Sequence, residues 1–213
     1  MRGKFIVFEG IDGSGKTTQQ RLLGETLGGL GYTVVDTREP GGTPLGEAVR
    51  RVLLDRSFTG MDGRAEAFLY AAARAELVHK VIEPALAGGK VVLCDRYLDS
   101  SLAYQGYGRG MEIPFLENIN GPATGEAIPD LVLILDLPCE LGRLRLGRTG
   151  QGKDRIEREM LEFHKRVREG YLNLAAQDRN RYRVVDAAGS PAEVRGIVAA
   201  AALEVLDGFP RGT

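Results

Sequence analysis

The chain has 213 residues, of which 43% are hydrophobic and 27% are charged, and its formal net charge is −1. This length fits one domain over residues 1–213, and the nearly neutral charge argues against a general binder of nucleic acid or membrane surfaces, which would normally be basic. Two cysteines, no signal-peptide pattern and no apolar run of membrane-spanning length are typical of a cytoplasmic protein without disulfides.

Short apolar, β-branched segments alternate with helical patterns along the chain. Strands are predicted at residues 5–8, 33–35, 91–94 and 131–135, with a fifth candidate at 182–185. Helices are predicted at residues 16–27, 45–54, 64–86, 138–146, 155–177 and 192–206. Because strands that are apolar on both faces must be covered on both sides, we predict a three-layer α/β fold with a parallel sheet of about five strands.

A glycine-rich loop follows the first predicted strand and precedes the first predicted helix. It matches the P-loop pattern G-x-x-x-x-G-K-[ST] in full, which predicts a P-loop NTPase fold. The residues expected to surround the triphosphate are Gly10, Ile11, Asp12, Gly13, Ser14, Gly15, Lys16, Thr17 and Thr18. Glycines let backbone N–H groups converge on an anion, Lys16 supplies a charge for the β- and γ-phosphates, and the Thr17 hydroxyl is expected to bind Mg²⁺. A dinucleotide fingerprint fails because Thr18 stands where its third glycine is required.

P-loops serve switches, motors and kinases alike, so other features must decide between these classes. The chain has no Asn-Lys-x-Asp guanine reader, and motors are typically larger and more basic. A small phosphoryl-transfer kinase is therefore the favoured class.

Three further motifs resemble those of the thymidylate kinase family in order and spacing. They are residues 37–43 (TREPGGT), 95–106 (DRYLDSSLAYQG) and 154–157 (DRIE), and the likeness continues to about residue 186. The resemblance implies transfer of the γ-phosphate of MgATP to dTMP, giving dTDP and ADP, by a homodimer that binds neither nucleic acid nor membranes. Two alternatives stay open: another nucleoside monophosphate or deoxynucleoside kinase, and a P-loop regulatory ATPase that needs a protein partner.

Cations should dominate the chemistry of such a transfer. The second pKa of a phosphate monoester is about 6, so the attacking oxygen of dTMP is mostly ionised at neutral pH and needs no general base. The resemblance implies that Arg96 grips the acceptor phosphate, with Arg38 and Arg50 as further contacts, and that Asp95 orients Mg²⁺ through water. The alternatives are a strand-end salt bridge between Asp95 and Arg96, and a merely exposed helical position for Arg50.

Tyr70 and Arg74 stand four residues apart on a predicted helix and therefore share a face. The resemblance places the Tyr70 ring against thymine and the Arg74 guanidinium at the edge of the base. Tyr70 replaces the phenylalanine usual in the family, so its hydroxyl needs a partner or water. By its own pattern Tyr70 also fits a core position. Phe68, on another face, is predicted to be core.

Five further residues resemble the rest of the nucleoside pocket: Asp12, Glu39, Ser101, Tyr104 and Gln105. Tyr104 lies where the family's tyrosine crowds the 2′ position of the sugar, which would disfavour ribonucleotides. Asp12 resembles the acidic residue that meets the sugar 3′-hydroxyl, but it fits an N-cap of the first helix as well.

A polar, glycine-broken gap is predicted to form a lid over about residues 147–155, and the tail of residues 207–213 is expected to fray. Basic residues cluster around this gap: Arg143, Arg145, Arg148, Lys153 and Arg155. The eukaryotic branch of the family has an arginine inside the P-loop where this chain has Gly13, whereas the bacterial-type branch brings one from the lid. The resemblance thus implies Arg148 and Arg155 as stabilisers of phosphoryl transfer and Arg145 as a contact of adenine, with a solvated basic face as the alternative.

Overall fold

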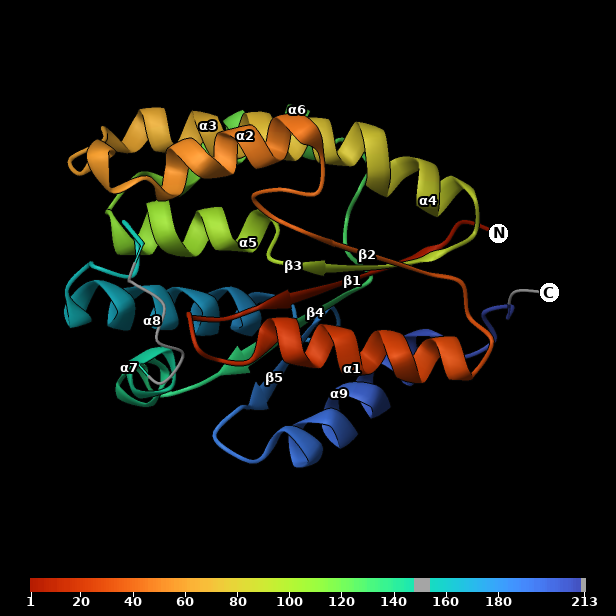
Figure 1. Ribbon diagram of the computed structural model, residues 1–213. Helices are drawn as coiled ribbons and strands as arrows, with labels where there is room; N and C mark the ends of the chain where they lie inside the picture. Colours follow the sequence, from red (N-terminus) through yellow and green to blue (C-terminus); the bar gives the residue numbers. More distant parts are fainter. Residues whose placement is uncertain (148–153, 212–213) are drawn as a thin grey trace.

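The structure, a computed structural model, describes residues 1–147 and 154–211. A five-stranded sheet in the order β2-β3-β1-β4-β5 lies at its centre, and all neighbouring strands are parallel (Figure 1). The strands are β1 (Lys4–Glu9), β2 (Val34–Arg38), β3 (Val91–Asp95), β4 (Leu131–Asp136) and β5 (Tyr182–Asp186). The predicted α/β architecture is confirmed, including the fifth strand.

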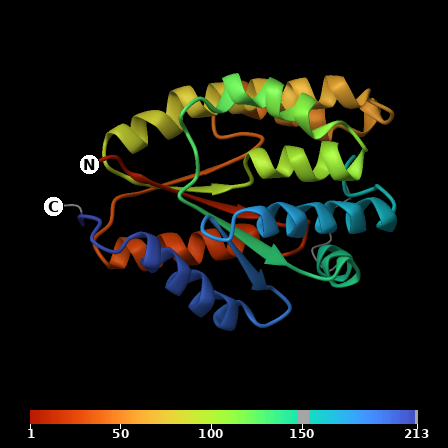
Figure 2. The same ribbon diagram turned by 180° about the vertical axis from the view of Figure 1, so that it is seen from behind.

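Helices cover both faces of this sheet. Helices α1 and α9 lie on one face, and α8 lies on the other, where Figure 2 shows it in front of the sheet with α5 beside it. Helices α2, α3 and α6 form a further layer above the sheet in Figure 1. The helices are α1 (Lys16–Gly29), α2 (Pro44–Leu54), α3 (Gly63–Leu77), α4 (Glu83–Ala87), α5 (Leu98–Ser101), α6 (Ile113–Thr124), α7 (Cys139–Gly147), α8 (Leu161–Gln177) and α9 (Pro191–Val205). The 3₁₀ turn η1 (Arg56–Phe58) and the π-helical segments η2 (Val78–Ile82) and η3 (Leu102–Gly108) lie between them.

The hydrophobic core is centred on the three inner strands of the sheet. Strands β1, β3 and β4 are buried almost throughout because they have neighbours on both sides and helices on both faces. The edge strands β2 and β5 mix buried, half-buried and exposed positions. The carboxyl ends of all five strands meet at one edge of the sheet, which is where α/β proteins bind their ligands. Among the described residues, no helix is both long and apolar enough to cross a bilayer.

Two predicted helices were wrong in part, and one helical stretch was not predicted. Residues 98–124 carry α5, η3 and α6, which we did not predict because glycines and Pro122 interrupt the helical pattern there. The long helix predicted over residues 64–86 is divided by the π turn η2, which precedes Pro84, a residue without an N–H to donate. The helix predicted to start at residue 155 starts at Leu161, because Asp154 accepts the N–H groups of Ile156 and Glu157 and forms a turn.

Two aromatic side chains also differ from expectation. Phe68 is 53% exposed and makes an edge contact with Phe115, so its assignment to the core was wrong. Phe209 lies in the segment that we expected to fray, but it is buried and stacks on Tyr32. A single buried aromatic residue in a short polar tail produces no hydrophobic periodicity, so the sequence pattern does not predict it.

Candidate active site

The P-loop connects β1 to α1 in a conformation that only glycines adopt easily. Gly10, Gly13 and Gly15 have φ values of 135°, 80° and 95°. Helix α1 has no side-chain cap, so Asp12 does not cap it and its first N–H groups are left for an anion. A Cβ at Gly13 would lie 2.5 Å from the carbonyl oxygen of Gly142 in α7, which leaves no room for an arginine at that position.

Lys16 is buried beneath the loop. Its Nζ donates to the carbonyl oxygens of Gly10 at 3.1 Å and Ile11 at 2.9 Å. Burial, together with the neighbouring charge of Arg96, lowers the pKa of Lys16 to about 8. A bound polyphosphate would stabilise the ammonium form, so this cation is poised to respond to nucleotide.

Thr17 and Asp95 lie side by side at the sheet edge, where the Thr17 hydroxyl donates to Asp95 Oδ2 at 2.6 Å. The described residues contain no group of three or more His, Cys, Asp or Glu side chains that could hold a metal. Mg²⁺ is usually held by one or two protein oxygens, phosphate oxygens and waters, so one hydroxyl and one carboxylate fit this ion.

Arg96 occupies a strained position directly after β3. Its φ of 70° is left-handed, which a non-glycine residue rarely adopts outside functional sites. The guanidinium forms an ion pair with Asp12, and so the predicted alternative of a salt bridge with Asp95 is not found. It also donates to oxygens of Gly10 (3.0 Å), Tyr104 (3.1 Å), Tyr171 (3.1 Å) and Ser100 (3.3 Å).

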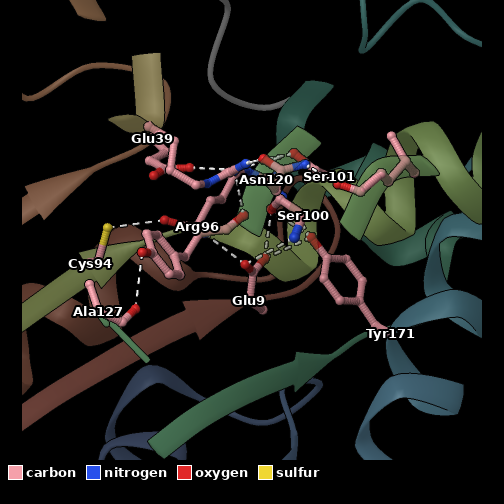
Figure 3. A network of polar contacts seen from close by, with 12 residues as sticks. Glu9, Glu39, Cys94, Arg96, Ser100, Ser101, Asn120, Ala127 and Tyr171 are labelled. Atoms are coloured by element: carbon pink, nitrogen blue, oxygen red, sulfur yellow. Dashed lines mark hydrogen bonds and ion pairs between the residues drawn. The ribbon is translucent and has the colours of Figure 1, made fainter. Parts of the chain in front are cut away.

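Glu9 helps to orient Arg96 through Ser100 and Tyr171, a role that we did not predict. Figure 3 shows its carboxylate facing Ser100 and Tyr171, whose hydroxyls donate to it at 2.6 and 2.8 Å and also contact Arg96. Burial raises the pKa of Glu9 to about 7. An acidic residue at the end of an otherwise apolar strand, next to the P-loop, is the sequence signal that could have identified it.

Two cavities meet at this point. A cleft of about 1410 Å³ is lined by residues 12–18 of the P-loop and by Arg38, Arg50, Asp95, Arg96 and Arg145. A smaller pocket is lined by Tyr70, Arg74, Ser101, Tyr104 and Gln105. Asp12, Glu39, Arg50 and Arg96 line both cavities. The P-loop and the predicted nucleoside pocket therefore open toward the same guanidinium.

Arg74 forms the deep wall of the smaller pocket with an exposure of only 1%. It donates to Glu39 at 2.5 Å, to Ser101 Oγ at 3.2 Å and to Asn120. Burial raises the pKa of Glu39 to about 7, although the charge of Arg74 opposes that shift. Asn120 was missed because its helix, α6, was not predicted.

The remaining aromatic and acceptor-side residues also reach the cavities. Tyr70 is half-buried: it packs against the small apolar cluster of Val49, Leu53 and Ala73 and also lines the smaller pocket. Tyr104 is buried, and its hydroxyl lies 3.2 Å from Asp12 Oδ2. Arg38 pairs with Glu47 at 2.9 Å, and Arg50 donates to the Pro40 carbonyl at 3.1 Å, with both arginines at the wall of the cleft.

The basic residues of the predicted lid are separated. Arg145 lies at the cleft, where it donates to the carbonyls of Gly13 (3.5 Å) and Ala188 (3.2 Å). Arg155 is buried instead, with its guanidinium on the Leu53 carbonyl (2.8 Å) and on Glu66, and it lines neither cavity. Arg143 is exposed. Arg148 and Lys153 lie outside the described residues.

Comparisons with known proteins agree with this geometry. The family model described as Thymidylate kinase matches residues 8–196. A thymidylate kinase of Pelotomaculum thermopropionicum is 58% identical over 212 residues, covering 100% of this chain and 98% of that protein. One of Symbiobacterium thermophilum is 51% identical over 208 residues, covering 98% of this chain and 96% of that protein. The crystal structure of thymidylate kinase from Ehrlichia chaffeensis matches with a TM-score of 0.75 and 35% identity over 97% of this chain and 99% of that chain.

Proposed function

Because the chain belongs to the thymidylate kinase family and so phosphorylates dTMP with ATP in dTTP synthesis, we propose that Arg96 is the cation between its two nucleotides. One observation carries this assignment: of the two arginines that line both cavities, Arg96 has a guanidinium that contacts the P-loop at Gly10 and Asp12 and the smaller pocket at Tyr104. A guanidinium at that junction binds the acceptor phosphate bidentately and turns it toward the triphosphate.

The reaction then depends on charge and alignment. The P-loop N–H groups and Lys16 hold the β- and γ-phosphates of ATP, while Arg96, Arg38 and Arg50 hold the phosphate of dTMP. The ionised dTMP oxygen attacks the γ-phosphorus, the bond from that phosphorus to the bridging oxygen of ADP breaks, and no proton has to be removed. Fixed cations lower the repulsion between the two anions as they approach.

The smaller pocket holds the nucleoside of dTMP in this proposal. Tyr70 stacks on the base, and Arg74, Ser101 and Gln105 face its polar edge. Tyr104 and Asp12 take the sugar, with the buried Tyr104 ring filling the space that a 2′-hydroxyl would need. Glu39 acts through Arg74, which it holds in place.

On the ATP side, we assign Arg145 to the adenine end of the cleft, because it bridges the P-loop and the loop after β5. The assignment of Arg148 to transition-state stabilisation rests on the sequence alone, since that residue lies outside the described part of the chain. Arg155 joins it only if its guanidinium leaves Glu66, with which it forms a buried ion pair.

Mg²⁺ completes the proposed site, with Thr17 as a direct ligand and Asp95 as the carboxylate that orients its water. When bound, this ion neutralises charge on the β- and γ-phosphates. We expect Asp95→Asn to raise the Mg²⁺ concentration needed for half-maximal activity by about 10- to 100-fold, because an amide keeps the shape but loses the negative charge. Activity titrated with Mg²⁺ at fixed ATP measures this. An unchanged requirement would remove Asp95 from the metal site.

We also propose that the chain is a single domain and that it acts in the cytoplasm as a homodimer. Sedimentation equilibrium tests the dimeric state. Large exposed apolar side chains support a partner surface on α2, η1 and α3. They are Leu45 (50%), Val52 (38%), Phe58 (46%) and Phe68 (53%).

The acceptor specificity tests the proposed pocket. We expect dTMP to give the highest rate of ADP release among dTMP, dUMP, dCMP and dGMP with MgATP, because the pocket is small and is lined by aromatic and polar side chains. A strong preference for a purine acceptor would contradict the pocket assignment. Slow ATP hydrolysis at a rate that dTMP does not change would instead indicate a regulatory ATPase.

A further inference from the structure

Glu66 is a fully buried carboxylate on α3. It does not line the smaller pocket itself, but it contacts Gln105, which does. We propose that Glu66 is a positioning residue that fixes the orientation of the Gln105 amide and thereby selects the base of the acceptor nucleotide. The inference rests on the proposed assignment of the smaller pocket to the base of dTMP.

The surroundings of Glu66 keep it ionised. Its Oε1 accepts from Gln105 Nε2 at 2.8 Å and from Arg109 Nε at 2.7 Å. Its Oε2 accepts from Arg109 Nη2 at 3.0 Å and from Arg155. Burial alone would raise the pKa of Glu66, but the hydrogen bonds and charge of Arg109 hold it below its usual value. An ionised carboxylate can only accept hydrogen bonds.

This restricts Gln105 to one of its two amide orientations. The NH₂ group must face Glu66, because the amide oxygen would meet a negative oxygen there. The amide oxygen is therefore the polar atom that Gln105 offers to the pocket it lines. Among the described residues, no side chain or backbone group donates to this oxygen.

The amide oxygen of Gln105 is thus an acceptor in the pocket wall that has no partner among the described residues. Thymine and uracil present a donor at N3–H, which can bind this oxygen. Cytosine presents an acceptor at N3, which would leave two acceptors facing each other. Arg74 Nε also lacks a hydrogen-bond partner in the described part of the chain, but it is buried and is not offered to the base.

Glu66→Gln tests the proposal because it should turn the amide of Gln105 around. The new side chain would direct its oxygen to the position where Arg109 Nη2 and Arg155 donate, and its NH₂ group to Gln105. Arg109 Nε, which donates to the same position as Gln105, would lose its acceptor there, and Arg109→Met removes this conflict in a second variant. Gln105 would then accept from it and present NH₂ to the pocket. We expect the ratio of kcat/KM for dTMP to that for dCMP to fall by about 10- to 100-fold, the effect of one mismatched buried hydrogen bond.

The dTMP-to-dUMP ratio is the internal control. Thymine and uracil share their polar edge, so this ratio should stay within about twofold, whereas a merely loosened pocket would change both ratios. Glu76→Gln, a partly exposed residue on the same helix, should leave both ratios unchanged. In a Gln105→Leu background, Glu66→Gln should have no further effect on the dTMP-to-dCMP ratio, because the two residues act as a unit.

Glu66→Gln leaves buried arginines with less negative charge and can fail to fold. The second variant, Glu66→Gln with Arg109→Met, removes one charge of each sign and should show the same fall in the ratio. A folded variant that keeps the wild-type dTMP-to-dCMP ratio overturns the proposal, as does a further fall in the Gln105→Leu background. A wild-type chain that forms no dTDP would instead refute the proposed function, so the two failures are distinguishable.

Discussion

Replacing Arg96 with alanine is expected to lower kcat/KM for dTMP about 10³-fold while the protein stays folded. Two charge-assisted hydrogen bonds to the acceptor phosphate would be lost, each worth about 2 kcal/mol, and each 1.4 kcal/mol corresponds to about a tenfold rate. The loss should appear in both KM for dTMP and kcat, because the same guanidinium binds the phosphate and aligns it. Steady-state kinetics with dTMP varied at saturating MgATP measure it.

Two further variants separate recognition from charge at this position. Arg96→Lys keeps the charge but not the planar fork, so it should recover only part of the activity. Arg179→Ala removes an exposed arginine next to the start of β5, at the opposite end of the sheet, and should have no effect. If Arg96→Ala retained the wild-type KM and kcat with an unchanged melting temperature, the phosphate contact would have to be assigned elsewhere.

The strained backbone at Arg96 strengthens this interpretation. A φ of 70° at an arginine lowers the free energy of unfolding relative to a glycine at that position. The surrounding contacts must therefore hold the Arg96 backbone in this conformation. Glu9 is part of that support through Ser100 and Tyr171. Several buried polar groups thus fix the orientation of one guanidinium. A purely structural ion pair would not require so many.

The parts of the site that are local in sequence could be predicted. The P-loop is one continuous segment whose glycines, lysine and threonine each have a separate physical reason, and the Tyr70–Arg74 pair follows from helical spacing. The strands were equally accessible, because their apolar runs are short and bounded by turns.

The supporting contacts could not be predicted, because they join distant segments. Glu9 meets Tyr171 across 162 residues, and Glu66 meets Gln105 across 39 and Arg155 across 89. The position of Glu9 after an apolar strand is a local signal that it is buried, but not of its partners, and nothing in the neighbourhood of Glu66 distinguishes it from a solvated acid on a helix. The start of the helix predicted at residue 155 was wrong for a related reason, because the turn that Asp154 forms with Ile156 and Glu157 has no strong local signal.

Replacing Lys16 with methionine is expected to lower kcat by about 10²- to 10³-fold, the usual cost of removing one preorganised donor from a transition-state charge. Methionine keeps the length and apolar stem of lysine, so the buried position remains filled. Single-turnover kinetics at saturating ATP and dTMP measure the effect on the chemical step. Lys80→Met, at an exposed lysine in η2, is the matched control and should be silent.

The pH dependence of ATP binding shows whether Lys16 acts as a charge. In the ligand-free protein its pKa is lowered to about 8, and ATP requires the protonated form. ATP affinity should therefore be constant below this pH and fall as the pH rises above it, with proton uptake on binding. Calorimetry in buffers of different ionisation enthalpy measures that uptake. In Lys16→Met both the fall in ATP affinity and the proton uptake should disappear. If the variant kept them, the group that takes up a proton when ATP binds would have to be another one.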